Sequence, residues 1–348
     1  MKKTLVIIFS VLGAAVVAVT AVFASLYYTD RVREGFDEDF VIRVYPDSEP
    51  HAILEEICLD GRAKSRRSME RCFKSAGTFE KIKPGYYPVK SSYTAVYVAR
   101  MLAFGWQEPC TLTLSGTLRT KGRIAKAISS QMMVDSLSIA AALDDELFLS
   151  RYGFNPQNVF ALIVPDSYQM YWTASVEEIF DRFKKEYERF WTPERDSLAR
   201  KQGLSRMEVS IMASIVNGET LQKDEYPVIA GVYLNRLRKG IKLQADPTVC
   251  YCFDYSLNRV LKKHLQVDSP FNTYKYAGLP PAPINVPPKA CIDAVLSPSV
   301  HNYIYFCASP EFNGRHRFAA SYSEHLKNAR EFQSALTKRE KQRRNAEQ

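Results

Sequence analysis

The sequence predicts an α+β protein with one N-terminal transmembrane helix, a small mixed module and a larger mixed domain. Three observations lead to this prediction. An uncharged apolar stretch covers residues 4–28. Short alternating strands and short helices then follow one another over residues 39–118. Helical patterns, interrupted by loop and strand pieces, fill residues 119–338 and precede a basic tail at 339–348.

The apolar stretch, Thr4–Tyr28, is longer than the ~20 residues that cross a bilayer. It also exceeds the ~7–15 residues of a signal-peptide core, so we favour an anchor over cleavage at Val22-Phe23-Ala24. Lys2 and Lys3 predict that residues 1–3 are a cytoplasmic stub, with the rest of the chain outside.

The composition, 46% hydrophobic and 24% charged, is that of a globular protein with a packed core. The formal charge of +9 is also found in proteins that bind nucleic acid. A basic ectodomain, however, equally suits an anionic wall polymer or membrane surface. Since part of the excess lies in the tail, we expect no nucleic-acid partner.

The chain has seven cysteines, an odd number that leaves at least one thiol unpaired. If Cys250 and Cys252 lay in a strand, both would face one side, but no second pair at zinc spacing accompanies them. We therefore expect buried free cysteines and no metal site.

The small module is predicted from alternation, apolar spacing and turn residues. Its expected strands or extended pieces are Phe40–Tyr45, Tyr86–Val89 and Thr111–Leu114, and its expected helices are His51–Leu59, Ser68–Ser75 and Ala95–Phe104. In the larger domain, a further helix is expected over Ser175–Phe190, with Ser175 and Glu178 as its capping box.

Ser205 and Glu208 form another capping box and begin a helix whose apolar arc includes Ile215 and Val216. Glu219 falls inside that arc, where Gly218 indicates that the helix is ending. Desolvation and the negative end of the helix dipole should both raise the pKa of this carboxyl. A raised pKa suits a general acid, although Glu219 could instead cap the helix or form an ion pair.

Pro227 begins a second helix that stops at Gly240, and Asn235 lies on its apolar face, where its amide needs a buried partner. The next segment, Leu243–Thr248, contains an amide, a carboxylate and a hydroxyl. Pro247 favours an extended backbone before it, so we expect a rigid stretch. Such groups suit the hydroxyl-rich surface of a sugar.

Several segments together resemble the endolytic murein transglycosylases, the MltG/YceG-like family. They are Ala213–Thr220, Asn235–Leu237, Leu243–Thr248, Asn272–Tyr274, Gly278–Ile284 and His316–Phe318 with His325. Weaker similarity covers a LysM-like module containing Lys83-Pro84-Gly85. Asn217-Gly218 departs from the more charged residues common before the glutamate of the family.

The resemblance implies an inner-membrane protein with a periplasmic catalytic domain and Glu219 as its catalytic residue. It implies cleavage of the β-1,4 bond between N-acetylmuramic acid and N-acetylglucosamine in nascent peptidoglycan, with 1,6-anhydro ends, termination of elongation and no cofactor or metal. The expected partners are glycan strands, the lipid bilayer and peptidoglycan synthases. The residues expected to bind substrate are Asn235, Gln244, Asp246, Thr248, Asn272, Thr273, Tyr274 and His316.

Two alternatives remain open at this point. Asp246 could be the second carboxylate of a muramidase-type hydrolase, since ordinary glycosidases use two. The chain could also be a non-catalytic wall-binding protein whose LysM-like module is the functional part.

Overall fold

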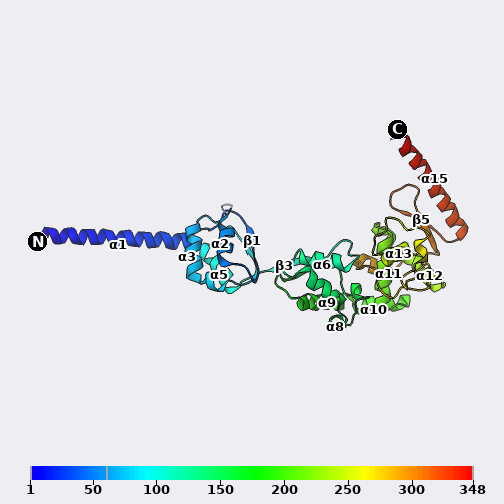
Figure 1. Ribbon diagram of the computed structural model, residues 1–348, viewed down its shortest axis with the longest axis horizontal. Helices are drawn as coiled ribbons and strands as arrows, with labels where there is room; N and C mark the ends of the chain where they lie inside the picture. The colour runs from blue at the N-terminus through cyan, green and yellow to red at the C-terminus, as the bar shows by residue number, and fades with distance from the viewer. Residues whose placement is uncertain (1, 60–61, 347–348) are drawn as a thin grey trace. The chain divides into compact units, whose positions relative to one another are not determined.

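The computed structural model describes residues 2–59 and 62–346, which fall into two compact units. The first unit contains the chain up to Leu112, together with Gln131–Met133 and Gln169–Ala174. The second contains Thr113–Ser130, Val134–Tyr168 and the chain from Ser175 onward. Figure 1 shows the elements of each unit along the chain.

Helix α1, Lys2–Arg31, contains the predicted apolar span and is drawn in blue in Figure 1. It is long and apolar enough to cross a membrane, and none of its apolar window is buried within the protein. Its last turn is held against helix α3 (Arg66–Ala76) of the same unit, because Asp30 pairs with Arg71 at 2.6 Å and accepts a hydrogen bond from Ser68 at 2.5 Å. The predicted helix is therefore present and extends a few residues beyond Tyr28.

The first unit is the small α+β module. Strands β1 (Phe40–Val44) and β2 (Gly85–Val89) pair antiparallel, with Ile42 opposite Tyr87. The helices α2 (Pro50–Cys58), α3 (Arg66–Ala76), α4 (Thr78–Lys81) and α5 (Ala95–Phe104) surround a core that includes Phe36, Phe73 and Leu102. The predicted strands and helices are confirmed to within about two residues at their ends. The LysM likeness of this module stays a prediction.

The following region is mostly helical, as predicted. Strand β3 (Pro109–Thr113) pairs with β4 (Ser167–Tyr171), which interrupts the helical stretch. The helices are α6 (Lys121–Ser129), α7 (Ser136–Asp144), α8 (Glu146–Ser150), α9 (Val176–Phe190) and α10 (Pro193–Gln202), with a 3-10 turn at Val159–Ala161. The capping box of Ser175 and Glu178 at the start of α9 is confirmed.

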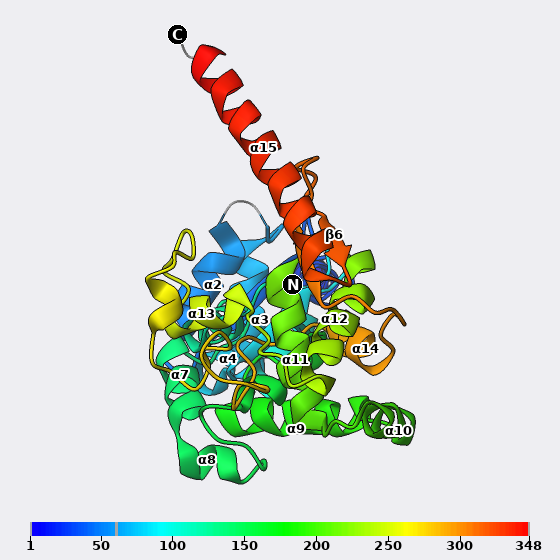
Figure 2. The same cartoon turned by 90° about the vertical axis from the view of Figure 1, so that its right-hand side faces the viewer.

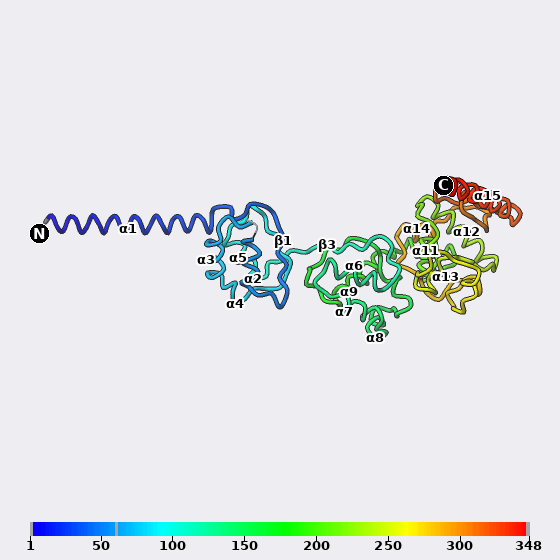
Figure 3. Tube along the Cα trace, turned by 45° about the horizontal axis from the view of Figure 1, so that its top comes forward, coloured from blue at the N-terminus to red at the C-terminus, as the bar shows by residue number. Residues whose placement is uncertain are grey.

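Helices α11 (Arg206–Glu219), α12 (Tyr226–Arg238), α13 (Asp246–Cys252) and α14 (Lys289–Leu296) build the part of the second unit that holds Glu219. Helix α11 packs against the other three helices, and Figure 3 shows them together. Two 3-10 turns, Lys223–Glu225 and His264–Gln266, lie in the connections. The capping box of Ser205 and Glu208 is confirmed at the start of α11.

The last part of the chain is a hairpin and a long helix. Strands β5 (Tyr305–Ala308) and β6 (His316–Ala319) pair antiparallel, and α15 (Tyr322–Ala346) begins against them. Figure 2 shows α15 in red, continuing away from the hairpin. The basic segment that the sequence presents as a tail is helical as far as Ala346.

The structure corrects two local predictions. Asp246 is the first residue of α13 rather than part of an extended stretch, because Pro247 stands in the first helical turn, where its fixed φ and missing N–H are favourable. Cys250 and Cys252 lie in the same helix and are free thiols as expected, but they are half-buried rather than buried.

Glycine at position 218 allows α11 and α13 to approach closely. A Cβ atom there would lie 2.5 Å from Cβ of Pro247, a distance that real Cβ atoms essentially never show. The contact places the end of α11, and therefore Glu219, directly against the start of α13.

We predict that Gly218→Ala lowers the free energy of unfolding by about 1–3 kcal/mol, because the added methyl group forces α13 away from α11. Urea unfolding followed by circular dichroism would measure this. The matched control is Gly122→Ala in α6, where a Cβ meets open space and better helix propensity should be neutral or stabilising by up to ~1 kcal/mol. Equal effects of the two substitutions would contradict the packing argument.

Candidate active site

Glu219 is the last residue of α11 and follows the buried arc that includes Met212, Ile215 and Val216. Its side chain lies on the wall of two pockets. The predicted placement of a carboxylate at the end of an apolar helix face is therefore confirmed.

The carboxyl of Glu219 accepts a hydrogen bond from Tyr233, whose hydroxyl lies 2.5 Å from Oε1. Burial raises the pKa of Glu219 from its ordinary 4.5 to about 7. The Tyr233 hydrogen bond opposes this rise, the charge of Asp246 adds to it, and the charge of Arg236 opposes it. The predicted rise in pKa is confirmed, and burial is its main cause.

The first pocket has a volume of about 320 Å³. It is lined by Glu219, Tyr233, Arg236, Gln244, Asp246, Tyr274, Tyr305, Phe306, Tyr322 and His325. Carboxylate, amide, guanidinium and aromatic side chains thus share one cavity, and such a set offers both hydrogen bonds and apolar faces to a sugar ring.

Arg236 is 8% exposed and organises the floor of this pocket. Its Nη1 donates to the Leu243 carbonyl at 2.7 Å and its Nη2 to Oε1 of Gln244 at 2.9 Å. Gln244 has a left-handed backbone, with φ of 51°, which costs a non-glycine residue free energy and persists only where the surroundings enforce it. Arg236 therefore fixes the amide of Gln244 at the pocket wall.

Asp246 lies on the wall common to both pockets. Tyr274 donates its hydroxyl to Oδ1 of Asp246 at 2.6 Å. Burial and this carboxylate raise the pKa of Tyr274, so the phenol stays protonated as a donor. Glu219 and Asp246 thus face the same cavity with different partners, and Glu219 is half-buried whereas Asp246 is exposed.

The second pocket, about 280 Å³, shares Glu219 and Asp246 with the first. Its lining residues are Arg119, Gly218, Glu219, Asp246, Pro247, Cys250, Tyr255 and Leu257. Because the two pockets share two carboxylates, a linear polymer that occupies both would pass Glu219.

Three of the residues expected to bind substrate are buried and line neither pocket. Thr248 and Thr273 bond to each other through their hydroxyls at 2.9 Å, and Thr273 also accepts from the backbone N–H of Ala245 at 3.0 Å. Asn272 donates to the carbonyls of Leu265 and Val267 at 2.9 and 2.8 Å. These side chains hold the start of α13 against the loop that carries Tyr274.

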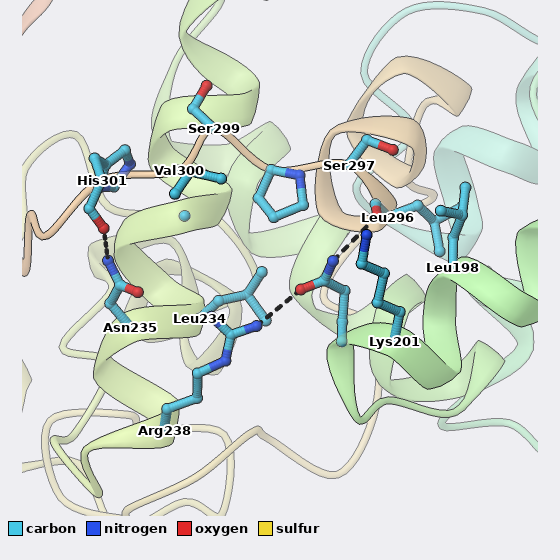
Figure 4. A pocket seen from close by; sticks show the side chains of 13 residues that line it. Leu198, Lys201, Leu234, Asn235, Arg238, Leu296, Ser297, Ser299, Val300 and His301 are labelled. Carbon is cyan, nitrogen blue, oxygen red and sulfur yellow. Dashed lines mark hydrogen bonds between the residues drawn. The ribbon is translucent and has the colours of Figure 1, made fainter.

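Asn235 and His316 also lie apart from the two pockets. The amide of Asn235 donates to the carbonyl of His301 at 2.8 Å, and Figure 4 shows this bond within a separate pocket that also contains Leu234 and Arg238. Asn235 follows Tyr233 by two residues and therefore lies on the opposite face of α12. His316 contacts Glu225 at 2.9 Å through Nδ1. The structure therefore does not bring Asn235 and His316 to Glu219.

The sequence analysis missed several residues that line the pockets, above all Tyr233, Arg236 and Arg119. Tyr233 and Arg236 are polar groups three residues apart in a largely apolar helix, a spacing that places both on one face. This spacing could have marked the pair as candidate site residues from the sequence alone. Arg119 is distant in sequence and carries no local signal. Over residues 2–59 and 62–346, no group of three or more His, Cys, Asp or Glu residues is arranged to hold a metal ion.

The sequence model of the YceG-like family matches residues 42–331. This chain belongs to the YceG-like family. It is 30% identical over 273 residues to the endolytic murein transglycosylase of Bacillus subtilis, covering 73% of each chain. It is 24% identical over 282 residues to the enzyme of that name from Streptococcus pneumoniae, covering 72% of this chain and 50% of the relative. The family predicted from the sequence motifs is confirmed.

A crystal structure of a YceG-like protein from Listeria monocytogenes is similar to this YceG-like chain. The TM-score is 0.54 at 25% identity, and the match covers 83% of this chain and 99% of the other. The likeness therefore extends over nearly the whole of the chain in that crystal structure.

We predict that Glu219→Gln stabilises the protein at pH 8 by about 1–3 kcal/mol and has no such effect at pH 4. A raised folded-state pKa means that the folded state holds the proton more tightly, so stability is lost as pH rises from 4.5 to about 7. Glutamine is neutral throughout and avoids that loss. Urea unfolding of both proteins at the two pH values measures the difference, and a gain of equal size at pH 4 would contradict the burial argument.

Proposed function

We propose that this YceG-like chain is a lytic transglycosylase that cleaves the β-1,4 bond between N-acetylmuramic acid and N-acetylglucosamine within nascent peptidoglycan strands. The cut leaves a 1,6-anhydro end and terminates elongation of the glycan. One observation carries the proposal: a half-buried glutamate, whose pKa desolvation raises to about 7, lies on a wall shared by two pockets. The relatives named endolytic murein transglycosylases support it.

In the first step, protonated Glu219 donates its proton to the glycosidic oxygen, and the bond from that oxygen to the anomeric carbon breaks. The N-acetyl group of the muramoyl residue stabilises the positive charge on that carbon. In the second step, the 6-hydroxyl of the same sugar attacks the carbon and gives its proton to Glu219. The residue returns to its starting state, and no water enters the reaction because the nucleophile is intramolecular.

The surroundings of Glu219 suit both steps. Burial and the charge of Asp246 favour the protonated form that must donate. The hydroxyl of Tyr233 and the charge of Arg236 favour the carboxylate that forms after the proton has left. With a pKa of about 7, neither form is strongly preferred at neutral pH, as acid/base catalysis requires.

Helix α1 gives the enzyme a single membrane anchor in this proposal. Lys2 and Lys3 put the N-terminus in the cytoplasm, so the catalytic unit lies on the periplasmic side of the inner membrane, where nascent strands are made. Peptidoglycan synthases, which elongate those strands, are the corresponding partner proteins.

A second candidate function is a hydrolase in which Asp246 activates water or attacks the sugar. Asp246 shares both pockets with Glu219, and its charge contributes to the raised pKa of Glu219. That pairing is the feature of two-carboxylate glycosidases. The products distinguish the candidates, because hydrolysis leaves reducing ends rather than anhydro ends.

We expect the full-length chain in detergent to convert peptidoglycan strands into fragments with anhydro ends, and Glu219→Gln to abolish this cleavage while strands still bind. Mass spectrometry of the products and co-sedimentation with strands measure the two properties. Reducing ends would support the hydrolase, and strands that bind but stay intact with the unaltered chain would indicate a wall-binding protein. Persistent cleavage by Glu219→Gln would remove this residue from the mechanism.

We further predict opposite shifts of the alkaline limb of the rate profile for two substitutions. Tyr233→Phe removes a hydrogen bond that lowers the pKa of Glu219, so the limb should move to higher pH. Asp246→Asn removes a charge that raises this pKa, so the limb should move to lower pH. Measuring kcat/KM between pH 5 and 9 tests both signs. Complete loss of activity in Asp246→Asn would instead favour the hydrolase.

A further inference from the structure

The second pocket contains a positively charged side chain, Arg119, that has no ion-pair partner among the described residues. Arg119 forms no ion pair within the part of the chain that the structure describes, although Glu219 and Asp246 line the same pocket. Its guanidinium lies over the ring of Tyr255, 5.3 Å from the centroid. A cation–π contact of this kind positions the guanidinium without using its N–H groups, which stay available to an anion.

The segment around Arg119 is held in place on both sides. The carbonyl of Leu118, a buried residue, accepts a hydrogen bond from the Val286 N–H at 3.0 Å. Thr120 caps helix α6 and accepts from the N–H of Arg123 through its hydroxyl. The position of Arg119 at the pocket is therefore set by the fold, not by a free loop.

Tyr255 is also fixed, and at a cost in backbone strain. Asp254 and Tyr255 both have left-handed backbones, with φ of 50° and 56°, which consecutive non-glycine residues rarely adopt. The Tyr255 hydroxyl donates to the Ile284 carbonyl at 2.5 Å, and its N–H donates to the Cys250 carbonyl at 2.8 Å. These bonds enforce the strained turn and hold the ring on which Arg119 stacks.

We propose that Arg119 determines specificity by binding a carboxylate on the muramoyl unit next to the bond that is cut. This inference rests on the proposed function. In a glycan of alternating N-acetylglucosamine and N-acetylmuramic acid, only the muramoyl unit bears an acid, through its lactyl arm or the peptide attached to it. An arginine sharing a pocket with Glu219 is placed to recognise that unit, since its planar fork matches a carboxylate.

The group that Arg119 would recognise is a carboxylate, and a muramoyl unit can supply it from two places. In intact strands the lactyl carboxyl is consumed in an amide bond, so the acid comes from the peptide. In strands stripped of peptide, the lactyl carboxylate itself is free. The recognition step involves no covalent change, and Arg119 contributes binding of the substrate rather than proton transfer.

The test compares the full-length chain in detergent with Arg119→Gln on three substrates. They are strands with peptides, strands stripped by an amidase, and stripped strands whose lactyl carboxyls have been converted to amides. We expect KM to rise about tenfold or more for a substrate that bears the recognised carboxylate, with kcat nearly unchanged. The amidated strands should show no difference between the two proteins. A rise on intact strands alone identifies the peptide, and a rise on stripped strands alone identifies the lactyl arm.

Two further variants control for charge and geometry. Arg238→Gln removes the same charge from the separate pocket that contains Asn235, where Arg238 bonds to Gln202, and should leave KM unaltered. Arg119→Lys keeps the charge but loses the planar fork, and should recover part of the affinity. An equal loss on all three substrates, or no loss on any, would overturn the proposal.

Binding measurements separate this proposal from the proposed reaction. If the unaltered chain makes no cut, the reaction is wrong, but strand affinity can still be measured for Glu219→Gln with and without Arg119→Gln. A lower affinity of the double variant for carboxylate-bearing strands, and not for amidated ones, would still support the role of Arg119. Equal affinities would refute it.

Discussion

The hydrogen bond from Tyr233 to Glu219 is the interaction on which the site depends. Burial alone would leave the carboxyl with a strong preference for its proton, and it could not then act as a base. The tyrosine hydroxyl and the nearby Arg236 charge oppose that preference and bring the pKa to about 7. The balance requires helices α11 and α12 to be packed together, because each contributes one partner.

The rest of the second unit maintains that geometry. Gly218 admits Pro247 at the end of α11, so the carboxylate of Asp246 reaches the same wall as Glu219. The hydroxyls of Thr248 and Thr273 join the start of α13 to the loop that supplies Tyr274. Arg236 then fixes Gln244 in a strained backbone. Residues from separate segments are thus held by buried hydrogen bonds, which are costly to leave unsatisfied.

The motif residues divide into two kinds by their contacts. Gln244, Asp246 and Tyr274 face the first pocket. Asn235 and Asn272 instead donate hydrogen bonds to backbone carbonyls, and His316 is hydrogen-bonded to Glu225. Membership of a motif therefore does not reveal which role a polar residue has, since holding a loop and contacting a ligand call for the same side-chain chemistry.

The sequence by itself determined the features that depend on local periodicity and capping. It predicted α1, the strands and helices of the small module, the capping box before α11 and the raised pKa of Glu219 at the end of an apolar arc. These follow from interactions between residues near one another in the chain. It misplaced Asp246, because proline is compatible both with an extended predecessor and with a first helical turn.

Only the tertiary structure decided which distant side chains surround Glu219. Arg119 contacts Tyr255, which lies more than a hundred residues later in the chain, and Tyr233 of α12 donates a hydrogen bond to Glu219 of α11. No local pattern encodes such meetings, since they depend on how helices pack and on where loops close. The chemistry of a single carboxylate was thus readable from the sequence, whereas the two pockets that it lines were set by packing.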